Sequence, residues 1–102
     1  MENLRFKDLS WDFNNINSSC ISHFAYFDEA GCTCTVDTTK YYLIIGSGDS
    51  GGKIPGINNA SILQSYKYGS GVRYVEVYLI KPTSSTITVS CYCMKGMVLK
   101  IS

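Results

Sequence analysis

The sequence contains few charged residues and few of the residues that favour helices. Charged side chains make up 17% of the 102 residues, whereas about 25% is typical of soluble domains. Alanine and glutamate occur only three times each, while Ser, Thr, Tyr, Asn and Gly are frequent. A hydrophobic content of 45% is nevertheless ordinary for a folded protein. The composition therefore disfavours both a helical bundle and a disordered chain.

The sequence also lacks a long apolar run, and its first residues do not predict a signal peptide. Its longest apolar stretch, residues 41–45, has the length of a strand, whereas a membrane-spanning helix needs about 18 residues or more. Residues 1–8 lack the basic start and apolar core of a signal peptide. We therefore expect a protein made in the cytoplasm that does not enter a membrane. In that setting the cysteines should be reduced thiols, and their odd number agrees: Cys20, Cys32, Cys34, Cys91 and Cys93.

A strong net charge is missing as well. The formal net charge is +1 and the pI is near 7.6, which gives no general attraction to nucleic acid or to an anionic membrane. The charges are unevenly distributed: residues 1–40 carry three basic and six acidic side chains, and residues 41–102 carry six basic and two acidic ones. Such a dipolar chain could stack head to tail with copies of itself.

Alternation of apolar and polar residues is the dominant pattern. Residues 86–93 alternate strictly, which predicts a half-buried strand with its apolar side chains and both cysteines on one face. Residues 97–101 should pair with this strand through a tight hairpin at Lys95-Gly96. The glycine-rich residues 46–59 are predicted to form a mobile loop. Further strands are expected at residues 19–27, 32–36, 41–46, 60–68 and 72–80, the last two joined by a turn at residues 69–71.

Six to seven short strands predict a single all-β domain over residues 1–102. Regularly spaced strands of this kind are typical of a small antiparallel β-sandwich or barrel. Only residues 4–11 could form one short helical turn. Residues 1–17 could instead act as an arm that docks onto a neighbour through its aromatic side chains.

Two short motifs resemble catalytic sequences, and both fail on inspection. Residues 48–52 spell Gly-Asp-Ser-Gly-Gly, the nucleophile motif of chymotrypsin-like serine proteases. Those enzymes need about twice this chain and a histidine base held by a buried aspartate, and His23 is the only histidine here. Residues 41–54 partly match a phosphate-binding loop, but Ser47 replaces its first glycine and Ile54 its magnesium-binding hydroxyl. We therefore expect no catalytic residues, no enzyme activity and no cofactor.

Two Cys-x-Cys pairs, Cys32 with Cys34 and Cys91 with Cys93, offer four thiols. Four thiolates could hold a structural zinc ion. However, the Cβ atoms of residues two apart on an extended strand lie roughly 6.5–7 Å from each other. Sulfur atoms on a tetrahedral zinc ion lie about 3.8 Å apart. Small core side chains are therefore the favoured interpretation, with no metal bound, and a zinc-stabilised binding domain is the alternative.

Eight tyrosines in a chain of low charge favour a protein interface, because tyrosine supplies a large contact area at low entropic cost. We expect a non-enzymatic structural protein that binds copies of itself or a larger scaffold. The composition is similar to that of accessory subunits of phage particles, such as capsid decoration or tail-associated proteins, so a virion is the expected location. A small inhibitor or adaptor of a host protein is an alternative. The expected interaction residues are Phe6, Trp11, Phe13, Tyr66, Tyr68 and Tyr74.

Overall fold

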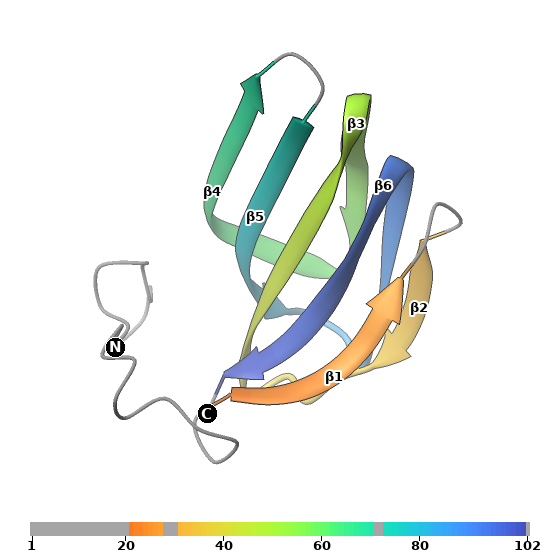
Figure 1. Ribbon diagram of the computed structural model, residues 1–102. Coiled ribbons are helices and arrows are strands. Elements are labelled where there is room, and N and C mark those ends of the chain that lie inside the picture. The colour runs from red at the N-terminus through yellow and green to blue at the C-terminus, as the bar shows by residue number, and fades with distance from the viewer. Residues whose placement is uncertain (1–20, 28–30, 71–72, 102) are drawn as a thin grey trace.

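The helices and strands of the described part of the protein are all antiparallel strands. The computed structural model describes residues 21–27, 31–70 and 73–101; the predicted arm at residues 1–17 and the predicted helical turn within it lie outside them. The prediction of an all-β antiparallel fold is confirmed (Figure 1). The six strands are β1 (Ile21–Phe27), β2 (Cys32–Thr35), β3 (Tyr41–Asn58), β4 (Ala60–Ser70), β5 (Arg73–Pro82) and β6 (Thr86–Ile101).

All six strands belong to one sheet in the order β1-β6-β3-β5-β4, and β2 pairs with another part of β6. β3 has 18 residues and β6 has 16, about three times the usual strand length. Figure 1 shows each of these two strands turning back, so that its two halves lie in different layers. The second half of β6 pairs with β1, whereas its first half pairs with β2. The protein is therefore one sheet folded over into two layers.

Two predicted turns are absent from the structure. The hairpin predicted at Lys95-Gly96 is wrong, since β6 continues through these residues and Gly96 pairs with both Phe27 and Gly46. The loop predicted at residues 46–59 is also wrong, because residues up to 58 belong to β3. Glycines suggested turns in both places, but here they allow two strands to approach closely. A Cβ atom on Gly96 would collide with the carbonyl oxygen of Ile45 and with the ring of Phe27.

The fold of the sheet is made by an irregularity between β3 and β6. Gly48 pairs with Met94 and Lys53 with Tyr92, so residues 49–52 of β3 lie opposite the single residue Cys93. On the bulged strand Gly51 has a positive φ of 88°, and opposite it Cys93 has a positive φ of 55°. Extra residues of this kind bend a strand and increase its twist. The predicted alternation therefore holds from residue 86 to residue 91 and fails at Cys93, because the next buried side chain is that of Met94.

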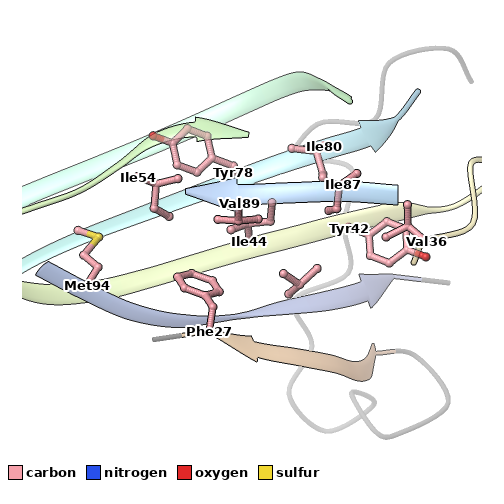
Figure 2. Close-up of a cluster of buried hydrophobic side chains, with 11 residues drawn as sticks. Phe27, Val36, Tyr42, Ile44, Ile54, Tyr78, Ile80, Ile87, Val89 and Met94 are labelled. Carbon is pink, nitrogen blue, oxygen red and sulfur yellow. The ribbon is translucent and has the colours of Figure 1, made fainter. Parts of the chain in front are cut away.

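Because the alternation shifts at the bend, side chains from both halves of β3 and β6 point into the same interior. Figure 2 shows apolar side chains from the two layers meeting there. A buried carboxylate completes this interior: the Tyr78 hydroxyl and the backbone N–H of Ile54 both donate to Glu76 Oε1. We call this cluster the inner core; its buried apolar members are Phe27, Val36, Tyr42, Ile44, Ile54, Tyr78, Ile80, Ile87, Val89, Met94 and Val98.

Gly96→Ala should strongly destabilise the protein. Its methyl group would push against the β3 backbone at Ile45, and overpacking of this kind costs typically about 1–3 kcal/mol or more in the free energy of unfolding. Urea unfolding measures this loss. Gly56→Ala is the matched control, because a Cβ atom at Gly56 meets nothing within 4 Å. Equal stability of the two variants would contradict the close approach of β3 and β6.

Candidate functional site

Most of the exposed large hydrophobic side chains in the described ranges lie on one strand. Ile62, Tyr66 and Tyr68 expose 50%, 54% and 52% of their surface, and all three belong to β4. The fourth, Tyr92, is 59% exposed and lies on β6. Single exposed apolar residues are normal on a protein surface, but their concentration on one strand marks β4 as the candidate site.

β4 is an edge strand of eleven residues. Among the described strands it pairs only with β5, so its other edge is left without a neighbour (Figure 1). Edge strands present unpaired backbone groups, and proteins usually protect them with charges, prolines or bulges. β4 carries no proline and a single charge, that of Lys67, and its one register shift lies between Ile62 and Gln64. Most of this edge is therefore suited to pairing with another strand.

The register places the two exposed tyrosines on the same face of the sheet. Tyr66 pairs with Val77 and Tyr68 pairs with Val75, and directly opposed residues point to the same face. On β5, Val75 and Val77 alternate with Tyr78 and Ile80, which lie in the inner core. The two tyrosines therefore lie on the other face of the sheet, which we call the outer face. Tyrosine rings and valine side chains thus form one apolar surface at the end of the β4–β5 hairpin.

The outer face continues as an apolar surface across β5, β3 and β6. Leu79 pairs with Leu43, and Leu43 pairs with Leu99. Leu43 and Leu79 are buried, although they lie on the opposite side of the sheet from the inner core. We call this group the outer cluster; it comprises Leu43 and Leu79 with the partly buried Tyr41, Leu63, Val77, Leu99 and Ile101. A strand with apolar residues on both faces is typical of a sheet covered on both sides.

The charges around the outer cluster are positive. Three basic residues lie an even number of positions from its residues on β5 and β6, and therefore on the same face of the sheet: Arg73, Lys81 and Lys95. The ammonium group of Lys81 lies 5.0 Å from the centre of the Tyr41 ring, a distance that allows a cation–π interaction. The acidic residues among the described ones lie elsewhere: Glu76 in the inner core, Asp37 between β2 and β3, and Asp49 in the β3 bulge.

The structure separates the tyrosines that the sequence suggested as interaction residues. Tyr66 and Tyr68 share the outer face, whereas Tyr74 pairs with Gly69 on the opposite face and packs against the inner core. Phe6, Trp11 and Phe13 lie outside the described residues. Sequence reasoning did not single out Ile62 or Tyr92. The alternation of residues 86–92 did place Tyr92 on the polar face, and that pattern could have indicated its exposure.

Three of the four cysteines that the structure describes pack against the inner core as small side chains, and Cys93 at the bend does not. Cys32 and Cys34 on β2 and Cys91 on β6 contact the inner core, and Cys91 Sγ donates to the carbonyl oxygen of Met94 at 2.7 Å. Within the described ranges no three His, Cys, Asp or Glu side chains group together in a way that could hold a metal ion. Burial raises the pKa of the Cys32 thiol, and burial with the neighbouring Cys32 raises the pKa of the Cys34 thiol to about 11.

Cys34 should therefore react slowly with alkylating reagents. A pKa near 11 leaves far less thiolate at pH 8 than the ordinary value of 9.0, and the thiolate is the nucleophile. We expect iodoacetamide to modify Cys34 at least about tenfold more slowly in the native protein than in the urea-unfolded chain, as measured by mass spectrometry of peptides. Equal rates in the two states would contradict the burial of this thiol.

The same pKa shift predicts a loss of stability at alkaline pH. The folded state holds the Cys34 proton more tightly than the unfolded state, so this contribution is complete below about pH 9 and is lost as pH rises toward 11. The free energy of unfolding should fall over that range, and it should fall less steeply in Cys34→Ala. An identical slope in the variant would show that Cys34 does not contribute.

Comparison with known proteins assigns no family to the chain. No protein-family model, no curated protein and no solved structure matches it. In the part of the chain that the structure describes, no helix is long and apolar enough to cross a membrane. The function is therefore inferred from the residues and their geometry.

Proposed function

We propose that this chain is a non-enzymatic assembly subunit that joins copies of itself, or attaches to a larger protein scaffold, through β4. One observation carries the proposal: three of the four exposed large hydrophobic side chains described lie on this single edge strand. Exposed apolar surface of this kind marks an interaction site. An edge strand with few protective residues adds backbone hydrogen bonds as a second source of affinity.

Antiparallel pairing of β4 with β4 of a second copy gives the simplest assembly. A two-fold axis brings the same strand of each copy together, so that one surface serves both partners. The pairing extends the sheet and places Tyr66 and Tyr68 of each copy beside the strand of the other. A chain of 102 residues buries a limited share of its surface on its own, and such an interface would add to its stability.

The composition favours an accessory subunit of a phage particle as the setting. Low charge and abundant Thr, Ser, Gly, Asn and Tyr support a small β module that decorates a capsid or attaches to a tail. In that setting β4 would add to an exposed strand of the particle in the same way as it adds to a second copy. A scaffold strand and a second copy thus compete for one edge.

The double variant Tyr66→Ser/Tyr68→Ser tests the role of β4. Both side chains are more than half exposed, so their removal should leave folding intact while weakening association. We expect the dissociation constant for self-association to rise at least about tenfold, since truncation of central interface tyrosines typically costs about 1–2 kcal/mol or more. Size-exclusion chromatography with light scattering measures the mass across a concentration series.

Tyr92→Ser is the matched control, because Tyr92 is equally exposed but lies on β6. It should leave the association unchanged. A wild-type protein that stays monomeric at all concentrations and binds no isolated phage particle would refute assembly through β4. A stable monomer that captures one soluble host protein would favour the inhibitor or adaptor instead.

A further inference from the structure

The outer cluster is an apolar sheet face that no described strand covers. The second layer, made by β2 and the bent halves of β3 and β6, lies on the other side of the sheet and encloses the inner core (Figure 1). Leu43 and Leu79 are buried, but the surrounding side chains of Val77, Leu99 and Ile101 stay partly exposed. An apolar face of this extent calls for a covering group.

The segment that precedes Ile21 is connected to the described strands beside this face. Twenty residues precede Ile21, and Ile21 pairs with Ile101 of the outer cluster, which in turn pairs with Tyr41. From β1 to β5 is three strand spacings, or about 14 Å. Residues 14–20 could span up to about 23 Å when extended. The segment at residues 9–13 can therefore reach across β6, β3 and β5 of the same chain.

The sequence of that segment is complementary to the outer cluster. Leu9, Trp11 and Phe13 alternate with Ser10 and Asp12, so an extended backbone presents three large apolar side chains on one side. Residues 8–20 carry two acidic side chains and no basic one. The outer face, in contrast, carries Arg73, Lys81 and Lys95 alongside its apolar residues. The apolar side chains of the segment thus match the apolar outer cluster, and its acidic side chains match the basic residues of the outer face.

We propose that Leu9, Trp11 and Phe13 bind across Leu79, Leu43 and Leu99 of the same chain and cover the outer cluster. This interaction goes beyond assembly through β4, because Leu79, Leu43 and Leu99 lie on β5, β3 and β6. By register the cluster centres on the end of the outer face near Tyr41 and Ile101, whereas Tyr68 lies toward the opposite end beside Val75. The bound segment therefore leaves the edge of β4 accessible.

Trp11 is the only tryptophan, so its fluorescence reports directly on this binding. We expect the emission of the full chain to lie at shorter wavelength than in urea, with acrylamide quenching reduced severalfold. Measurements should be made at dilutions at which light scattering gives the mass of a monomer. Leu99→Asn in the outer cluster should restore the quenching of the unfolded chain, while circular dichroism still shows a β structure.

Two further variants keep the test decisive. Ile62→Asn is the matched control, because Ile62 is half exposed but lies on the opposite face of the sheet, and it should leave Trp11 protected. Asp12→Lys changes no described residue. It should increase the quenching of Trp11 severalfold, because it replaces attraction to the basic residues of the outer face with repulsion. If Leu99→Asn unfolds the protein, Asp12→Lys alone decides the outcome.

Trp11 quenched as readily in the native monomer as in urea would overturn the proposal. Protection that disappears on dilution to the monomer would also overturn it, since the segment would then bind a second copy. The Tyr66→Ser/Tyr68→Ser variant separates this inference from the proposed function: it should reduce the mass without changing the protection of Trp11. Loss of association and loss of protection are thus read by two independent measurements.

Discussion

The close crossing of β3 and β6 is the constraint on which the rest of the structure depends. Gly46 pairs with Gly96 where the two backbones approach too closely for a side chain at position 96. Just beyond this point, residues 49–52 of β3 bulge against Cys93, and both strands bend. The bend lets one hydrogen-bonded sheet fold over and enclose the inner core. Without it, the apolar faces of the two halves would remain in solvent.

This way of closing a core leaves two apolar surfaces on the outside. Folding over buries one face of the layer formed by β5, β3 and β6, while Leu43, Leu79 and their neighbours lie on the other face. Among the described strands the sheet also ends at β4 and does not close into a barrel, and that edge carries Tyr66 and Tyr68. A complete barrel would have no such edge. Both proposed interactions thus follow from how the sheet is folded.

The candidate site was only partly predictable from the sequence. Abundant tyrosine pointed to a protein interface and singled out Tyr66, Tyr68 and Tyr74 together. The structure places the first two on the outer face and packs Tyr74 against the inner core, because the β4–β5 register decides which side chains share a face. The edge position of β4 was also not predictable, since strand order depends on contacts between residues far apart in the chain.

The sequence by itself determined the all-β class, the strands predicted at residues 60–68 and 72–80, and the alternation up to Cys91. These features follow from local propensity and a two-residue period. The turn predicted at residues 69–71 is wrong at Gly69 and Ser70, which belong to β4. Only the tertiary structure decided that Gly48 and Gly96 permit close packing rather than turns, and that β3 and β6 continue past them. The physical reason is that glycine suits both a tight turn and the close approach of two backbones, and only the partner strand distinguishes the two.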